Sequence, residues 1–333
     1  MIDYTLFLLG LTILAALVFD FSNGWNDSAN AIATVVSTRV LSPMQAIILS
    51  ATLNFVGAFV STKVAKSIAG NIVYNPSVLD SKVMLASMIA AALWTIVLTR
   101  WGLPISCSHA LIGGIMGSAV IGHGLGVLNI KGLTPIFIAL LISPALGMLF
   151  GFLLMRGLNK MFANWAPRKV NSIFGKLQLI SVSFMALSHG TNDAQKVMGV
   201  ITMALVSAGV QTTLDVPVWV ILLCALTIAL GTALGGWKVI QTLGMNLIKL
   251  QPVHGFAAET SASGLLFFAA FLGLPVSTTH VITGSVLGVG SARRFSAVRW
   301  GIGKKIIYAW VFTLPASAVF AALIYLFLNA VLP

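Results

Sequence analysis

Two short stretches of the sequence repeat one another. Residues 22–30 read SNGWNDSAN, and residues 188–196, 166 positions later, read SHGTNDAQK. Residues 102–109 read GLPISCSH, and residues 273–280, 171 positions later, read GLPVSTTH. Two motifs that recur in the same order at nearly the same offset indicate an internal duplication. The sequence therefore predicts a chain built from two related halves.

The composition places both halves in a membrane. Of the 333 residues, 58% are hydrophobic and only 8% are charged, and the mean hydropathy is +1.01. A soluble domain needs far more charge to cover its surface. We therefore expect an all-α integral membrane protein, embedded in the lipid bilayer, with about 10–12 membrane segments. The first 20 residues lack a basic leading region and a clear cleavage site, so they are expected to form a first membrane helix.

Four segments rich in Gly, Ser or Thr are too short to cross a bilayer alone, which takes about 20 apolar residues. Each begins within one of the repeated polar motifs; they are residues 28–40, 104–121, 195–208 and 275–291. Irregular backbone at membrane depth survives only where it is buried in protein or lines a polar cavity. Broken helices and re-entrant hairpins are therefore predicted at these motifs.

Positive charge is concentrated in two loops. The net charge is +12, and ten of the 19 Lys and Arg lie in residues 156–176 and 293–305, which contain no acid. The positive-inside rule makes both loops cytoplasmic. The loop of the first half that matches 293–305 is 122–132, and Lys131 is its only Lys or Arg. Equivalent loops on opposite sides predict an inverted-topology repeat, as in many secondary transporters.

Residues 1–160 form the first half of this predicted repeat and residues 161–333 the second. Both termini are expected outside the cell, in a multi-pass protein of the plasma membrane. The cations lie in short loops and form no basic helix face or aromatic-basic module, so no nucleic-acid partner is expected. The sequence contains no nucleotide-binding P-loop, so nothing in it indicates direct use of ATP.

The chain has only seven acids, and two of them occupy equivalent places in the repeats: Asp27 after Asn26, and Asp193 after Asn192. A carboxylate inside a bilayer is costly unless it is compensated. An Asn-Asp pair offers oxygen ligands to sodium or a titratable site to a proton; capping of a helix start is the structural alternative. No cofactor is expected apart from possible sodium ions at the two aspartates. The residues predicted to serve the coupling cation or proton are Asn26, Asp27, Asn30, Asn192, Asp193 and Glu259.

The Gly-Leu-Pro motifs predict two helix starts, because Pro104 and Pro275 suit the opening of a helix. A helix start presents unpaired N–H groups and a partial positive charge. Hydroxyls there can bind an anion without a full counter-charge. Two such starts that face each other would form a cradle for a tetrahedral oxyanion, whereas capping without a ligand is the structural alternative. The hydroxyls of this cradle are those of Ser106, Ser108, Ser277, Thr278 and Thr279.

Several polar residues adjoin these motifs. His109 and His280 end the two Gly-Leu-Pro motifs and are expected to orient the site or accept a proton. Lys196 stands where the first repeat has Asn30, so it can pair with Asp193 or face the anion. Further neighbouring candidates are Asp20, His189 and Gln195.

The motifs together resemble those of the inorganic phosphate transporter (PiT) family, bacterial low-affinity type. The resemblance rests on residues 23–33 (NGWNDSANAIA), residues 188–199 (SHGTNDAQKVMG), both GLPxS stretches and residues 255–261 (GFAAETS), and it covers nearly the whole chain. It implies a membrane carrier, and no enzyme, that moves phosphate with sodium or protons, and it makes a homodimer plausible. By motif position it also implies anion contacts from Ser106, Cys107, Ser108, Ser277, Thr278 and Thr279, and cation contacts from Asp27, Asp193 and their Asn partners.

Lys196 departs from the family pattern, because many members keep N-D-x-x-N in both repeats. The Gln195-Lys196 variant is similar to bacterial members that look proton-driven and can take phosphate as a neutral metal complex. An amine beside Asp193 could also fill a place that sodium would otherwise take. We therefore expect proton coupling slightly more than sodium coupling and keep both open.

Three alternatives remain at this point. A sulfate carrier of the same family is one, although sulfate cannot donate a hydrogen bond to Asp27 or Asp193 near neutral pH, as monohydrogen phosphate can. An intramembrane aspartyl protease would use the same two acids as a catalytic dyad. A passive anion channel would show flux that is independent of any cation gradient.

Overall fold

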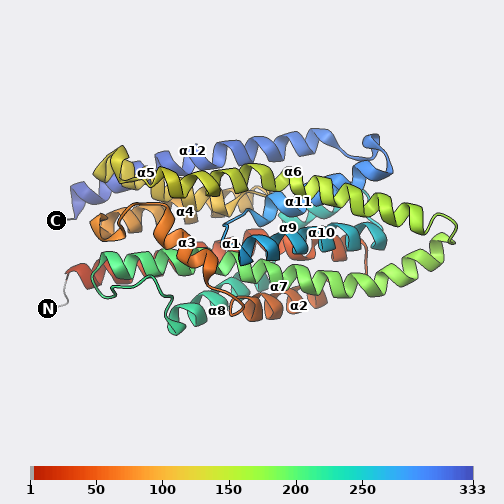
Figure 1. Ribbon diagram of the computed structural model, residues 1–333, viewed down its shortest axis with the longest axis horizontal. Coiled ribbons are helices and arrows are strands. Elements are labelled where there is room, and N and C mark those ends of the chain that lie inside the picture. The colour runs from red at the N-terminus through yellow and green to blue at the C-terminus, as the bar shows by residue number, and fades with distance from the viewer. Residues whose placement is uncertain (1–3, 333) are drawn as a thin grey trace.

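The computed structural model describes residues 4–332, which form a bundle of α-helices without an extended strand (Figure 1). The first half contains α1 (Tyr4–Ser37), α2 (Pro43–Gly57), α3 (Lys63–Asn71), α4 (Ser81–Arg100), α5 (Cys107–His123) and α6 (Ile130–Met161). The second half contains α7 (Pro167–Ser207), α8 (Val218–Leu234), α9 (Trp237–Ile240), the π-helical turn η3 (Gln241–Asn246), α10 (Pro252–Phe271), α11 (Thr278–Arg293) and α12 (Trp300–Val331).

The order and lengths of the helices repeat from the first half to the second. Both α4 and α10 have 20 residues, and both α6 and α12 have 32. A single 3-10 turn separates α5 from α6, and another (η4, Phe295–Ala297) separates α11 from α12. The duplication seen in the motifs therefore extends to the secondary structure of the described residues.

Five helices of the described residues are long and apolar enough to cross a membrane: α1, α4, α6, α7 and α12. A sixth span is possible if α8 and the following α9–η3 segment, bent by 68°, count as one. This is fewer than the expected 10–12. Segments that the sequence analysis separated are joined within α1 and α7, and α2, α5 and α11, with 15, 17 and 16 residues, are too short to count as spans. The exposed surface of the bundle carries many large apolar side chains, as a lipid-facing surface should.

The predicted breaks at the two Asn-Asp motifs are wrong. Both motifs lie inside continuous helices, α1 with 34 residues and α7 with 41, so 28–40 and 195–208 do not begin separate hairpins. The polarity of these motifs resides in side chains, and the helical backbone bonds remain intact beneath them. Asn26, Asp27, Asn192 and Asp193 are all buried against other helices, which removes the need for a break.

The Gly-Leu-Pro motifs, in contrast, do interrupt the chain. Gly102 (φ 75°) ends α4 and Gly273 (φ 70°) ends α10, both in the left-handed conformation that glycine tolerates. The next N–H, of Leu103 or Leu274, returns to the carbonyl of Leu98 at 3.1 Å or of Ala269 at 2.9 Å, which closes the helix end. A short segment without helical structure then leads to the next helix.

Each of these helices begins with a serine cap. Ser106 caps α5 and Ser277 caps α11, and each hydroxyl accepts the N–H three residues on, from His109 or His280. The proline precedes the cap by two positions, so it lies in the segment before the helix and not in the first turn, where it was expected. The helix starts themselves lie where the sequence analysis placed them.

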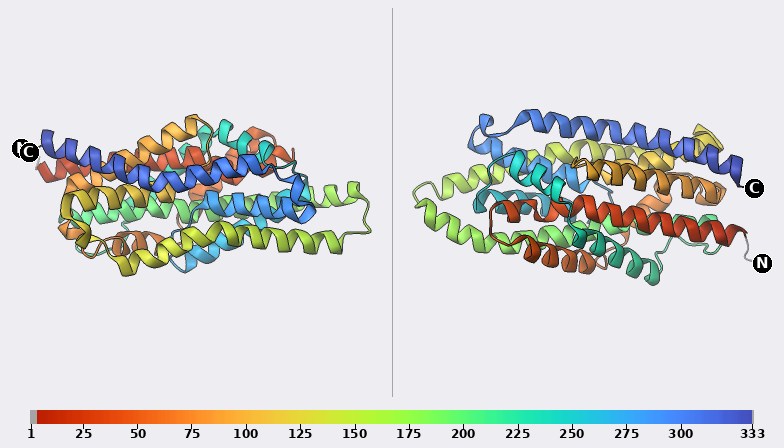
Figure 2. Two further views of the ribbon diagram at one scale, coloured as in Figure 1. Left: turned by 90° about the horizontal axis from the view of Figure 1, so that it is seen from above. Right: turned by 180° about the vertical axis from the view of Figure 1, so that it is seen from behind.

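The two halves pack by exchanging helices. In the first exchange, α2 lies against α7 and α8 lies against α1; in the second, α6 lies against α11 and α12 lies against α5 (Figures 1 and 2). Glycine permits the close approach: a Cβ on Gly113 would lie 2.4 Å from the Leu314 carbonyl, and one on the equivalent Gly284 would lie 2.2 Å from the Pro144 carbonyl. Neither half therefore buries its helices without the other.

The start of α1 and the end of α12 lie at the same end of the bundle (Figures 1 and 2). The connection from α6 to α7 and the η4 segment lie at the opposite end. The two basic stretches, 156–176 and 293–305, thus share one end of the molecule, as two loops on one side of a membrane must.

Candidate functional site

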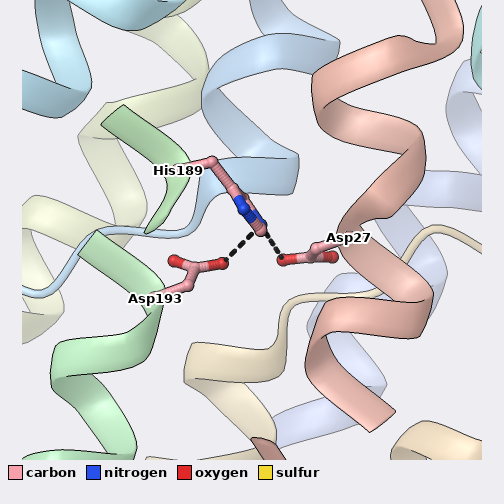
Figure 3. A group of neighbouring side chains, drawn as sticks. All are labelled: Asp27, His189 and Asp193. Atoms are coloured by element: carbon pink, nitrogen blue, oxygen red, sulfur yellow. Dashed lines mark ion pairs between the residues drawn. The ribbon is translucent and has the colours of Figure 1, made fainter. Parts of the chain in front are cut away.

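Two carboxylates from different halves approach one histidine in the middle of the bundle. Asp27 comes from α1, and Asp193 and His189 come from α7 (Figure 3). The His189 Nε2 atom lies 3.1 Å from an Asp193 oxygen and 3.9 Å from an Asp27 oxygen. None of the three side chains is more than 2% exposed. The site thus holds two acids in an environment without water contact, where uncompensated charge is costly.

Basic groups from α7 compensate part of this charge. The Lys196 ammonium donates to Asp193 at 2.6 Å and is itself buried. His189 is oriented from its other side, because its Nδ1 lies 3.0 Å from the Asn54 amide oxygen on α2. In the first repeat the positions of His189 and Lys196 are occupied by Asn23 and Asn30. The described basic side chains in contact with the carboxylates therefore all come from the second repeat.

The first turn of α11 reaches both carboxylates. Thr278 donates to Asp193 at 2.7 Å, and Thr279 donates to Asp27 at 3.0 Å. The Asn30 amide in turn donates to the Thr279 hydroxyl at 2.9 Å. Five predicted site residues from three separate stretches of sequence thus form two adjoining hydrogen-bonded groups that share the first turn of α11.

The start of α5 adjoins the start of α11. The Ser108 hydroxyl donates to the Val276 carbonyl at 3.0 Å, one residue before the cap of α11. The rings of His109 and His280 lie 4.9 Å apart between their centroids. Cys107 is buried and within electrostatic range of both aspartates. The first turns of the two helices therefore meet beside the carboxylates, as an anion cradle would require.

The capping serines are occupied within their own helices. Ser106 accepts the His109 N–H and also lies 2.6 Å from His109 Nδ1, so this histidine supports the cap. His280 instead stacks on Trp310, with 3.9 Å between ring centroids, and its Nδ1 lies 3.4 Å from the Leu140 carbonyl. The hydroxyls that point toward the acids are those of Thr278 and Thr279, which makes the cradle unequal between the two halves.

Some predicted residues lie elsewhere. Glu259 accepts hydrogen bonds from Thr34 at 2.5 Å, from Gln178 at 2.9 Å and from Ser181, so it forms a separate buried cluster between α1, α7 and α10. In the described residues no hydrogen bond or ion pair joins this cluster to Asp27 or Asp193. Glu259 is therefore a satisfied buried acid in this conformation.

Gln195 and Asn26 hold neighbouring segments in place. The Gln195 oxygen accepts the N–H groups of Val64 at 2.8 Å and Ala65 at 3.3 Å, which caps the start of α3. The Asn26 amide donates to Thr99 at 2.7 Å and to the Leu103 carbonyl at 3.3 Å, which ties α1 to the end of α4. Asn192 is buried with no hydrogen-bond partner for either amide atom.

The sequence analysis missed Asn54 and Trp310. Asn54 orients His189 from α2, and Trp310 donates to the Pro104 carbonyl at 2.9 Å while it stacks on His280. An amide near the end of a mostly apolar helix is a signal that could have identified Asn54, because such a group needs a buried partner in a membrane. Trp310 gives no comparable signal, since tryptophan is common in membrane helices for other reasons.

The donor atoms suit a cation on the Asp27 side better than on the Asp193 side. Asp27, His189 and Asp193 can each direct one ligand atom to a common point, with these atoms within 4.8 Å of one another. The amide oxygens of Asn26 and Asn30, which flank Asp27 on α1, are buried without a partner, and sodium favours such oxygens. Asp193 already has an ammonium ion as its partner. The residues present therefore fit one cation beside Asp27.

A buried cluster of acids, bases and hydroxyls within apolar helices is the signature of a protein that moves polar solutes across a membrane. The chain belongs to the phosphate transporter family, whose model matches residues 23–321. The matched range includes most of both repeats and every predicted site residue except Asp20. The protein is thus a multi-pass membrane protein of a transporter family.

Curated relatives agree with this assignment. A protein of Bacillus subtilis named probable low-affinity inorganic phosphate transporter is 45% identical over 332 residues, 99% of each chain. A protein of the same name from Rhizobium meliloti is 44% identical over 96% of this chain and 95% of its own length. A solved structure titled "The sodium-dependent phosphate transporter" superposes with a TM-score of 0.88 at 27% identity, covering 98% of this chain and all of that one. These relatives are transporters and not enzymes, so the aspartyl protease alternative is rejected.

Proposed function

We propose that this protein is a secondary symporter of inorganic phosphate, coupled to protons or sodium, that works by alternating access. The observation that carries the proposal is the pair of carboxylates, one from each repeat, that meet at His189 and hold the first hydroxyls of α11. Phosphate binds where the starts of α5 and α11 adjoin this pair. The anion ligands are Ser106, Cys107, Ser108, Ser277, Thr278, Thr279 and Lys196.

Charge balance requires a co-transported cation. With Asp27 and Asp193 ionised, Lys196 charged and His189 neutral, the site has a net charge of −1, and protonation of His189 makes it neutral. A phosphate dianion would bring this to −3 or −2 in a region where each unpaired charge is costly. Protons or sodium ions must therefore enter with the anion. A passive channel has no use for such a site.

The coupling ion follows from the difference between the repeats. Lys196 stands where an Asn, as at Asn30 in the first repeat, would leave room for sodium. Because its ammonium fills that space, a proton is the favoured coupling ion at Asp193. The free oxygens of Asn26 and Asn30 favour a cation at Asp27, and the solved relative is named as sodium-dependent. A neutral complex of phosphate with a divalent metal would reduce the same charge problem, and the carboxylate–imidazole set of Asp27, His189 and Asp193 suits such a metal.

Alternating access rests on the two halves, residues 1–160 and 161–333, as inverted repeats that rock about the site. The reciprocal packing of α2 with α7 and α8 with α1 supports this symmetry, because a two-fold axis exchanges the members of such pairs. The two basic stretches share one end of the bundle, which we assign to the cytoplasm, and the two chain termini then face outside. A homodimer is part of the proposal by family analogy.

Phosphate is preferred over sulfate because it can donate as well as accept hydrogen bonds. Monohydrogen phosphate has one O–H that a carboxylate such as Asp27 or Asp193 can accept, and sulfate lacks it near neutral pH. A site built to pair with a donor rejects an analogue that leaves its acceptor unpaired.

Uptake of labelled phosphate by purified protein in liposomes tests the proposal, with pH and sodium gradients imposed separately. We expect accumulation above the external concentration with at least one gradient, and little inhibition by excess sulfate. Equilibration without accumulation under both gradients would indicate a channel and overturn the proposal. Equal competition by sulfate would overturn the substrate assignment alone.

A further inference from the structure

Asp20 is a buried acid on the same face of α1 as the central site. It precedes Asp27 by seven residues, which corresponds to about 10.5 Å along a helix axis. Asp20 is 0% exposed, and neither of its carboxyl oxygens has a hydrogen-bond partner. Asn23, one turn on and also fully buried, lacks partners for both of its amide atoms. The second repeat has Ala186 at the matching position, so this acid belongs to the first half alone.

The helices around this part of α1 bring no bonded cation to Asp20. His189 and Asp193 of α7 interact with Asp20 through their charge but form no hydrogen bond to it. Cys224 of α8 is the further titratable group near Asp20. The sequence of α2 contains no charged residue, His or Cys, and in α4 the only charged residues, Lys82 and Arg100, are at the two ends. His189 is engaged between Asp27 and Asp193, so it does not serve Asp20.

Two other buried acids have partners that Asp20 lacks. Asp193 has an ammonium ion and a hydroxyl, and Glu259 accepts from three donors. Asp20 has neither a base nor a donor, and the nearby Asp193 would repel its charge. A neutral carboxylic acid avoids this cost, because burial penalises the charged form far more than the neutral one.

We propose that Asp20 is a proton-binding site that carries one proton in each transport cycle, separate from the cation bound at the Asp27–Asp193 pair. The proton comes from water on the side where the site is open, binds a carboxylate oxygen, and returns to water on the other side. The inference rests on the proposed symport and adds a named proton carrier to it. It gives a role to a buried acid that has no hydrogen-bond partner and lies seven residues, about two helical turns, from Asp27.

The test compares Asp20→Asn with wild type in liposomes, with the membrane voltage clamped and a pH difference of about one unit imposed. Losing one coupled proton should lower the limiting accumulation of phosphate by about tenfold, because one unit of pH corresponds to one factor of ten per proton. Exchange of labelled for unlabelled phosphate at equal concentrations needs no net proton movement, so it should persist in Asp20→Asn. Asp20→Glu, which keeps a carboxyl, should restore accumulation.

Asp215→Asn is the matched control. Asp215 lies in an exposed loop and pairs with Lys66 at 2.6 Å, and this hydrogen bond lowers the pKa of Asp215 below its ordinary value. It therefore stays ionised near neutral pH, and its replacement should leave accumulation unchanged.

Equal accumulation by Asp20→Asn and wild type would overturn the inference, and so would loss of exchange in Asp20→Asn. Failure of exchange in wild type would instead overturn the proposed function itself. If Asp20→Asn does not fold, infrared spectra of the wild type at neutral pH decide: a C=O band of a protonated carboxyl group that shifts in Asp20→Glu supports the inference, and its absence overturns it.

Discussion

The hydroxyl of Thr279 donates a 3.0 Å hydrogen bond to Asp27, which lies 252 positions earlier in the chain. The neighbouring Thr278 makes the corresponding bond to Asp193 at 2.7 Å. The start of α11 in the second half thus supplies one hydroxyl to Asp27 and one to Asp193, the acids at equivalent positions of the two repeats. The site forms only when the two halves have packed together, because each half supplies part of it. The hydrogen bonds, the ion pair and the helix contacts that build it can each be tested by substitution.

Removal of the Thr279 hydroxyl should weaken phosphate binding. Thr279→Val keeps the shape of the side chain but leaves Asp27 without this donor, and a hydrogen bond to a charged group contributes about 1.5–3 kcal/mol. We expect the apparent affinity for phosphate to fall by about tenfold or more. Thr279→Ser should retain most of it.

Thr283→Val is the control for this prediction. Thr283 lies one turn further along α11 and is buried, and its hydroxyl has no hydrogen-bond partner. The affinity of the Thr283→Val variant for phosphate should match that of the wild type. Binding isotherms of purified protein compare the three variants, and unchanged affinity in Thr279→Val would exclude this hydroxyl from the anion site.

The buried ion pair of Lys196 should matter far more for stability than an exposed one. Lys196→Ala leaves the Asp193 carboxylate buried without its ammonium partner, and breaking such a pair costs about 3–5 kcal/mol. The exposed pair of Lys66 and Asp215 has the same 2.6 Å separation, so Lys66→Ala is a matched control in which little or no loss of stability is expected, because solvent screens an exposed pair. Thermal unfolding in detergent measures both, and equal losses would contradict the assignment.

Lys196→Asn should increase the dependence of uptake on sodium. The change restores in the second repeat the amide that the first repeat has at Asn30, so it replaces a fixed cation with an oxygen ligand. A free cation must then balance Asp193. The uptake rate should rise more steeply with sodium concentration than in wild type. An unchanged sodium dependence would show that Lys196 does not occupy the position of a bound cation.

Glycine at the contact between α5 and α12 should be essential for packing. A Cβ on Gly117 would lie 2.1 Å from the Ala318 carbonyl, so Gly117→Ala must push the helices apart. We expect a loss of about 1–3 kcal/mol, the usual cost of overpacking. Gly10→Ala on α1 is the control, because its Cβ meets nothing within 4 Å. That variant should be neutral or more stable by up to about 1 kcal/mol, and a matching loss in both variants would refute the packing argument.

Much of the fold could be predicted from local sequence. The ends of α4 and α10 follow from Gly102 and Gly273, and the starts of α5 and α11 follow from the serine caps, because these features depend on a few adjacent residues. The acids of the site could be identified for a similar reason, since Asp27 and Asp193 occupy equivalent places in a duplicated motif.

The error at the Asn-Asp motifs has a physical cause. A polar run such as 22–30 suggests a break in a membrane helix, because its side chains cannot face lipid. In α1 these side chains face α4, α7 and α11 instead, where Thr99 and Thr279 bond to them. Burial against other helices, which local sequence does not reveal, allows the helix to continue.

The sequence by itself determined that the chain is duplicated, lies in a membrane, and carries one Asn-Asp pair and one capped helix start in each half. These properties depend on composition and on interactions within a few residues. Only the tertiary structure decided that Thr278 and Thr279 divide between the two acids, that His189 stands between them, and that Glu259 is satisfied elsewhere. Those contacts join residues up to 252 positions apart, and they form only where packing of the exchanged helices brings the residues together.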